Sequence, residues 1–189
     1  MKTYHPMRRP DQQGHIDGMC GLYSVLNATS FLFDLSAQAD HQLFRELCLH
    51  TKGVFPEIVC DGVNLPGVES LLHTAKRWAA RNRPGKTFEW TMPLPRSHIF
   101  ETARAALDEM RALLHAARSA HERAIWIVGL GPPWGHFTTI TGIDETRVLF
   151  RDSYGIEHRD IAQFTTDKAK GGHDKIMLDY HESILATVA

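Results

Sequence analysis

The sequence predicts an α+β fold with a largely antiparallel sheet, and two observations lead to this prediction. Segments with helical spacing of apolar residues occupy most of the first two thirds of the chain, and short strand-like segments fill the remainder. A chain in which helices lead and strands follow favours α+β over alternating α/β units. Residues 1–189 are expected to form a single domain, because no repeat or long linker divides them.

Four helices are expected, each recognised by apolar residues three or four positions apart. Their predicted starts are Cys20, Ser36 or Asp40, Pro66 and Ser97. The first helix is apolar on nearly every face and is therefore expected to lie in the core. Residues 54–64, between the second and third helices, are predicted to be a loop, and Ile99 is placed on the apolar stripe of the last helix.

Six short strands are predicted from apolar or alternating runs bounded by turn residues. They cover residues 87–92, 124–128, 136–142, 147–152, 156–159 and 175–178. The run 124–128 is apolar at every position, which indicates a central strand buried on both faces.

Composition narrows the function classes. A net charge of −1 gives no electrostatic case for nucleic acid or an anionic membrane as partner, and no apolar run is long enough to span a membrane. No secretory signal is visible at the start. Three cysteines favour free thiols in a reducing compartment, so a cytoplasmic location is expected. Oligomeric state stays open, and Cys48 and Cys60 are interpreted as small buried hydrophobic side chains.

Cys20 is the candidate nucleophile. A thiol at a helix N-terminus meets the positive end of the helix dipole and unpaired backbone N–H groups, and both favour the thiolate. Gly18 and Gly21 flank the Met19-Cys20 pair and are expected to let the substrate and the backbone approach the sulfur.

His136 and Asp152 are the candidate partners of that thiolate. His136 begins a strand directly after a Gly-Pro-Pro-Trp-Gly loop, whose Trp134 and Gly135 are expected to line a substrate cleft. A hairpin centred on Asp144 would place His136 directly opposite Asp152, with Cβ atoms about 4.5–5.5 Å apart. A register slip of one residue would separate them onto opposite faces.

Acyl transfer also requires hydrogen-bond donors for the oxyanion of the tetrahedral intermediate. The backbone N–H of Cys20 and the side-chain amide of Gln13 are the candidates, with Gln12 as the alternative to Gln13. This chemistry requires no cofactor. A zinc site is not expected, because the chain has neither a Cys-x-x-Cys pair nor a His-Glu-x-x-His helix.

The order Gln13, Cys20, His136, Asp152 resembles that of the papain-like cysteine peptidases. The sixteen-residue step from His136 to Asp152 is similar to that of the bacteriocin-processing peptidase domains of peptide exporters. The resemblance lies in two blocks, residues 12–28 and 134–155. It implies a papain-like fold, in which N-terminal helices include a nucleophile helix packed on a C-terminal antiparallel sheet.

The expected function is therefore a cysteine hydrolase that cleaves a peptide, isopeptide or other amide through a Cys-His-Asp triad and a thioester intermediate. The expected partner is a peptide or protein substrate. Two alternatives remain, since fold does not settle function. One is an acyltransferase, transglutaminase-type enzyme or deamidase effector of the same fold, and the other is a catalytically inactive binding domain.

Overall fold

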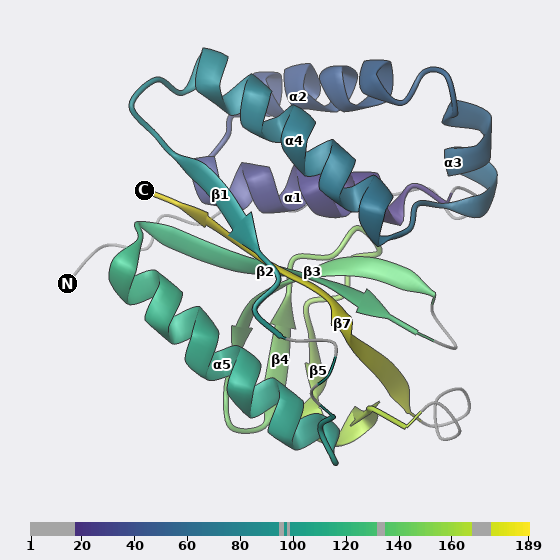
Figure 1. The fold of residues 1–189 in the computed structure, drawn as a ribbon, viewed down its shortest axis with the longest axis vertical. Coiled ribbons are helices and arrows are strands. Elements are labelled where there is room, and N and C mark those ends of the chain that lie inside the picture. The colour runs from purple at the N-terminus through teal and green to yellow at the C-terminus, as the bar shows by residue number, and fades with distance from the viewer. Residues whose placement is uncertain (1–17, 95–96, 98, 132–134, 168–174) are drawn as a thin grey trace.

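The computed structural model describes residues 18–94, 97, 99–131, 135–167 and 175–189. Within these residues the fold is α+β, as predicted, with five α-helices and one sheet of seven strands (Figure 1). All strand pairs are antiparallel except β6 with β7. None of the described helices has the length and apolar character needed to cross a membrane.

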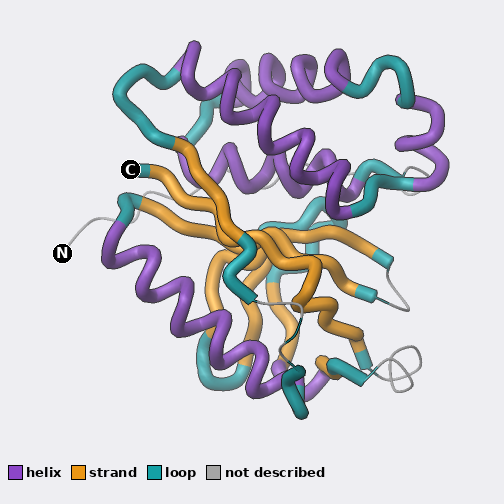
Figure 2. Tube along the Cα trace, in the orientation of Figure 1, coloured by secondary structure: helices purple, strands orange, loops and turns teal. Residues whose placement is uncertain are grey.

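The five helices are α1 (Cys20–Phe33), α2 (Ala37–His50), α3 (Phe55–Asp61), α4 (Leu65–Asn82) and α5 (Ala103–Ala120). The strands are β1 (Phe88–Thr91), β2 (Arg123–Leu130), β3 (His136–Ile143), β4 (Arg147–Phe150), β5 (His158–Asp160), β6 (Phe164–Thr165) and β7 (Ile176–Val188). Along the sheet the strand order is β1-β7-β2-β3-β4-β5, and β6 pairs with β7 (Figure 2).

The helix starts follow the capping chemistry of the sequence, with two corrections. Ser36 caps α2 by accepting a hydrogen bond from the N–H of Ala39. The last helix begins later than predicted, because Thr102 caps α5 and Ser97 lies outside the helix. Residues 54–64 are not all loop, since α3 forms within them.

Helix α1 is the most buried of the described helices. All of its residues except Tyr23 and Phe33 are buried. It packs on β2, β3 and β7 from one side, while α2 and α4 cover it from the other (Figure 1). Its nearly all-round apolar surface therefore has partners on every side, as the sequence predicted.

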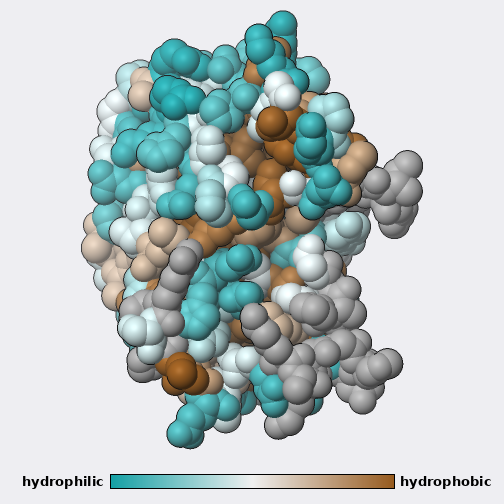
Figure 3. All heavy atoms as spheres, turned by 45° about the vertical axis from the view of Figure 1, so that its right-hand side comes forward, coloured by the Kyte–Doolittle hydropathy of each residue, from teal (hydrophilic) through white to brown (hydrophobic). Residues whose placement is uncertain are grey.

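Strand β2 lies at the centre of the sheet and supplies both cores. Ile125 and Ile127 point to the core formed with α1, α2 and α4, whereas Trp126 and Val128 point to the core under α5. This explains why the run is apolar at every position, because helices cover both faces of the sheet. The face shown in Figure 3 is mostly hydrophilic, and its apolar atoms show mainly in a strip through the upper, helical half.

Strand β7 is much longer than the four residues predicted, running through 13 residues beside both β1 and β2. Its register with β2 changes from Val128↔Ser183 to Gly129↔Asp179. Four positions on β7 therefore match one step on β2, so β7 carries a β-bulge of three extra residues. The predicted strand ended at Leu178, where this polar bulge begins.

The β3–β4 hairpin differs from the predicted register. Its turn runs from Asp144 to Arg147, and the pairs are Ile143↔Val148, Gly142↔Leu149 and Ile140↔Phe150. The register shift leaves one extra residue on β3 between Ile140 and Gly142. Continued beyond Phe150, this register places Asp152 opposite Thr138, two positions from His136. An even offset keeps His136 and Asp152 on one face.

Burial on β2 leads to a stability prediction. Ile127 is 0% exposed and Ile99 is 80% exposed, so the same substitution tests a core position and a surface position. We expect Ile127→Ala to lower the free energy of unfolding by about 2–5 kcal/mol, since it leaves a cavity. Ile99→Ala should change it by less than about 0.5 kcal/mol. Denaturant unfolding measures both, and equal effects would contradict the described packing.

Candidate active site

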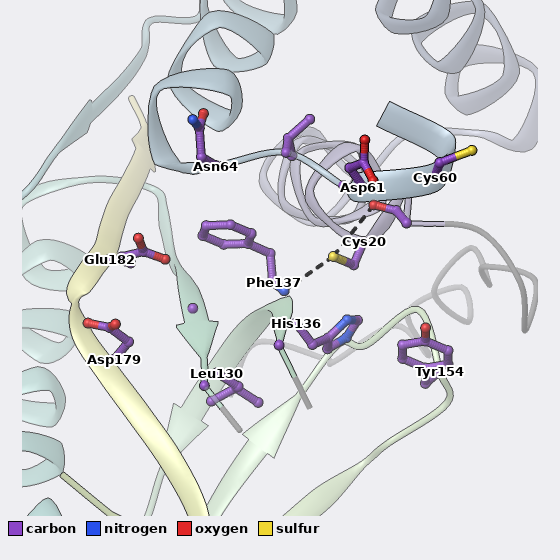
Figure 4. Close-up of a pocket in the computed structure, with 16 residues that line it drawn as sticks. Cys20, Cys60, Asp61, Asn64, Leu130, His136, Phe137, Tyr154, Asp179 and Glu182 are labelled. Carbon is purple, nitrogen blue, oxygen red and sulfur yellow. Dashed lines mark hydrogen bonds between the residues drawn. The ribbon is translucent and has the colours of Figure 1, made fainter. Parts of the chain in front are cut away.

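Cys20 is the first residue of α1, and its sulfur lies where the helix meets the sheet (Figure 4). The backbone N–H of Phe137 on β3 donates a hydrogen bond to the Cys20 sulfur at 3.5 Å. Among the described residues, no side chain caps the N-terminus of α1. The positive end of the α1 dipole lies at Cys20 and favours negative charge there.

The glycines around Cys20 have a packing role that the sequence did not reveal. Gly18 donates its N–H to the carbonyl of Val59 at 2.6 Å, and a Cβ on Gly18 would lie 2.6 Å from the backbone nitrogen of Gly62. A Cβ on Gly21 would overlap the side chain of Val63. Both glycines therefore let α3 and the following segment dock against the start of α1.

His136 and Asp152 form the contact expected from the sequence. The imidazole Nε2 of His136, at the start of β3, lies 2.8 Å from Oδ2 of Asp152, and both side chains are almost fully buried. Cys20 lies close enough to this imidazole to act on the pKa of His136. Because Nε2 bonds the carboxylate, Nδ1 is the nitrogen left for the sulfur. His136 thus lies between the thiol and the acid.

Charge and burial act in opposite directions on this pair. Burial lowers the pKa of His136, but the hydrogen bonds and charges of Asp152 and Cys20 outweigh it and raise the pKa from 6.5 to about 9. Burial raises the pKa of Asp152, whereas the hydrogen bond and charge of His136 bring it below its ordinary value. At neutral pH the pair is therefore an imidazolium beside a carboxylate.

The turn after β4 holds Asp152 in place. The N–H of Tyr154 donates to Oδ1 of Asp152 at 2.7 Å, and the N–H of Gly155 donates to the carbonyl of Asp152 at 3.2 Å. Asp152 therefore starts a turn and orients the imidazole at the same time. The ring of Tyr154 lies against that of His136, with centroids 4.6 Å apart.

A buried polar network ties Asp152 to the helical layer. Arg151 donates from Nη2 to the hydroxyl of Ser30 on α1, and that hydroxyl donates to Oδ2 of Asp40 on α2. The backbone N–H of Arg151 also bonds the carbonyl of Thr139 on β3. The residue next to the acid is thus fixed to the sheet and to the helix that carries Cys20.

Cys20 and His136 open into a cleft of about 410 Å³ (Figure 4). Its described lining comes from α3 and the segment after it, the facing ends of β2 and β3, the turn after β4, and β7. Gly18 and Gly135, both predicted to contact substrate, line this cleft.

Several lining residues were missed by the sequence analysis. They are Asp61, Tyr154, Asp179 and Glu182. The signal for two of them was present, because polar residues 179–182 interrupt an otherwise apolar run on β7. Tyr154 follows Asp152 by two residues in a recognised turn. Asp61 had no such signal, since its segment was assigned to a loop.

Other predicted residues have different outcomes. Gln12, Gln13 and Trp134 lie outside the described residues. Cys48 is half-buried, and burial raises its thiol pKa, whereas Cys60 is exposed at the cleft, so the buried interpretation of Cys60 was wrong. In the described part of the chain, no three His, Cys, Asp or Glu side chains gather in a group that could hold a metal ion.

The contact at Gly18 predicts a substitution effect. Gly18→Ala should lower the free energy of unfolding by about 1–3 kcal/mol, because the new methyl group meets backbone atoms that cannot rotate away. Gly53→Ala is the matched control, since a Cβ there meets nothing within 4 Å. Denaturant unfolding compares the two variants. Equal stability of both would contradict the docking of Gly18 on Gly62.

The raised pKa of His136 predicts a pH effect. A group whose pKa is higher in the folded chain stabilises the fold fully below its unfolded value, here 6.5, and loses that effect as pH rises through about 9. Asp152→Asn should lower the pKa of His136 from about 9, because burial remains while the charge of Asp152 is lost. Histidine NMR titration measures both proteins, and a wild-type midpoint near 6.5 would refute the pairing.

Comparisons with protein-family models, with curated proteins and with solved structures found no match to this chain.

Proposed function

We propose that this protein is a papain-like cysteine hydrolase that cleaves a peptide, isopeptide or other amide bond. The observation that carries the proposal is the position of His136, which is hydrogen-bonded with Asp152 and lines the same cleft as Cys20, close enough for Cys20 to act on its pKa. A thiol, an imidazole and an orienting carboxylate in this sequence of contacts are what nucleophilic acyl transfer requires.

The electrostatics of the site support a charged resting state. With a pKa of about 9, His136 is protonated at neutral pH, and a neighbouring imidazolium favours the thiolate form of a cysteine. The N–H donated by Phe137 to the sulfur and the N-terminal end of α1 act in the same direction.

The proposed reaction begins with attack of the Cys20 thiolate on the acyl carbon. The backbone N–H of Cys20, at the start of α1, is one donor for the oxyanion. His136 then gives its proton to the leaving amine as the C–N bond breaks, and a thioester remains on Cys20. Neutral His136 next takes a proton from water, and the resulting attack releases the carboxylic acid and restores the thiolate–imidazolium pair.

The supporting features of the fold are the buried nucleophile helix, the antiparallel sheet and the turn that orients the acid. Helix α1 lies on β2 and β3, and His136 and Asp152 come from β3 and from the segment after β4. This matches the arrangement that the papain-like resemblance implied, with Cys, His and Asp in the same order along the chain.

Thiol labelling tests the proposal. At neutral pH, Cys20 should react with iodoacetamide more than about tenfold faster than Cys48 and Cys60, although Cys60 is the most exposed of the three. His136→Ala should slow labelling of Cys20, whereas His158→Ala, which changes an exposed histidine on β5, should not. Peptide mass spectrometry reads each cysteine separately. Equal rates for all three cysteines would contradict a catalytic Cys20.

Activity variants separate the three roles. Cys20→Ala should abolish turnover, His136→Ala should lower it by about 10²–10⁴-fold, and Asp152→Asn should retain the most, because Asp152 acts through the imidazole and forms no bond to substrate. Mass spectrometry of an acyl-enzyme trapped from cell lysate supplies the substrate for this assay. Full activity in a folded Cys20→Ala protein would overturn the mechanism.

A further inference from the structure

The cleft that holds Cys20 is acidic on its described walls. Asp61 lies at the end of α3, and Asp179 and Glu182 belong to β7. The described lining contains no Lys or Arg, and its single histidine is His136. Because the whole chain has a net charge of only −1, this excess of carboxylates is a local feature of the cleft.

The β7 bulge is what brings two of these carboxylates to the cleft. Asp179 pairs with Gly129, and the three extra residues of the bulge, which include Glu182, separate it from the next paired residue, Ser183. A Cβ on Gly129 would lie 2.9 Å from Oε2 of Glu182, so the glycine leaves room for this carboxylate. Bulges beside active sites commonly redirect side chains in this way.

The carboxylates share the cleft with the Cys20 sulfur. In Figure 4, Tyr154 and His136 lie on one side of the cleft, Asp179 and Glu182 lie on β7 across from them, and Asp61 lies at the end of α3 above Cys20 in this view. A chain bound across the sulfur and away from Tyr154 therefore runs toward the carboxylates of β7. These carboxylates can act on a substrate because any substrate of Cys20 must enter this cleft.

On the basis of the proposed function, we propose that Asp61, Asp179 and Glu182 select peptide substrates with a Lys or Arg side chain near the bond that Cys20 attacks. A cleft lined by charges of one sign concentrates its field, which raises the local concentration of ligands of opposite sign. The same field repels acidic segments, so the selection has an attractive and a repulsive part.

Three reagents with one backbone test this selection. They are the iodoacetyl derivatives of Lys-Lys-amide, Gln-Gln-amide and Glu-Glu-amide, each of which alkylates a thiol and carries its side chains away from the sulfur as a peptide would. The readout is the second-order rate of alkylation at Cys20, measured by peptide mass spectrometry. In the wild type we expect the Lys reagent to exceed the Glu reagent by roughly tenfold or more at low salt, and the ratio to shrink at high salt.

Matched variants assign the effect to the cleft. Asp179→Asn/Glu182→Gln should bring the ratio of Lys to Glu rates close to one. Glu89→Gln/Glu109→Gln removes the same charge from exposed positions on β1 and α5, outside the cleft, and should keep the wild-type ratio. Asp179→Asn alone, expected to give an intermediate ratio, serves if the double variant does not fold.

The outcomes distinguish this selection from the proposed function. If Cys20 reacts rapidly with the neutral reagent but the Lys and Glu reagents react equally, the charge selection is wrong and the catalytic cysteine stands. If the control pair removes the preference as fully as the cleft pair, the acidic wall is not its cause. If Cys20 reacts no faster than Cys60 with the neutral reagent, the proposed function fails and the selection falls with it.

Discussion

The burial of α1 is the constraint on which the rest of the site depends. The helix is enclosed by the sheet on one side and by α2 and α4 on the other, and each buried leucine contributes about 1.5–3 kcal/mol to this enclosure. Turning or sliding α1 would break the close packing of Leu22 and Leu26, which are fully or almost fully buried. Cys20 is the first residue of this helix, so hydrophobic packing fixes the position of its sulfur against β3.

The acid end of the candidate site is fixed to the same helix by polar contacts. Arg151 reaches Ser30 near the C-terminal end of α1, while its backbone bonds β3. Asp152 follows directly and holds His136, which lines the same cleft as Cys20 at the N-terminal end of α1. The N-terminal end of α1 thus carries the thiol, and contacts near its C-terminal end hold the segment that carries the acid. The distance between thiol and acid is therefore set by one rigid helix.

The features that the sequence predicted well are those set by local pattern. The all-round apolar helix, the continuous apolar strand 124–128 and the cap at Ser36 each depend on residues within a few positions of one another. The pairing of His136 with Asp152 was also predicted, although from a register that proved two residues away. The predicted contact still forms because a register difference of two residues, an even number, leaves each side chain on the same face of the sheet.

The features that were missed depend on contacts between distant segments. Helix α3 has only seven residues, and it is supported by burial of Ile58 and by the contact of its C-terminal end with Gly18. The length of β7 is set by pairing with both β1 and β2, which overrides the polar residues in its middle. The residue pattern within α3 or within β7 does not indicate which distant segments they contact.

The docking of α3 on the start of α1 joins main chain to main chain. Gly18 meets Val59 and Gly62 through backbone atoms, so this contact does not depend on the side chains of Cys60 and Asp61. Cys60 and Asp61 are therefore open to replacement during evolution without displacement of the nucleophile. Such an arrangement separates the part of the cleft that must stay constant for chemistry from the part that can diverge, so new preferences can arise here by single substitutions.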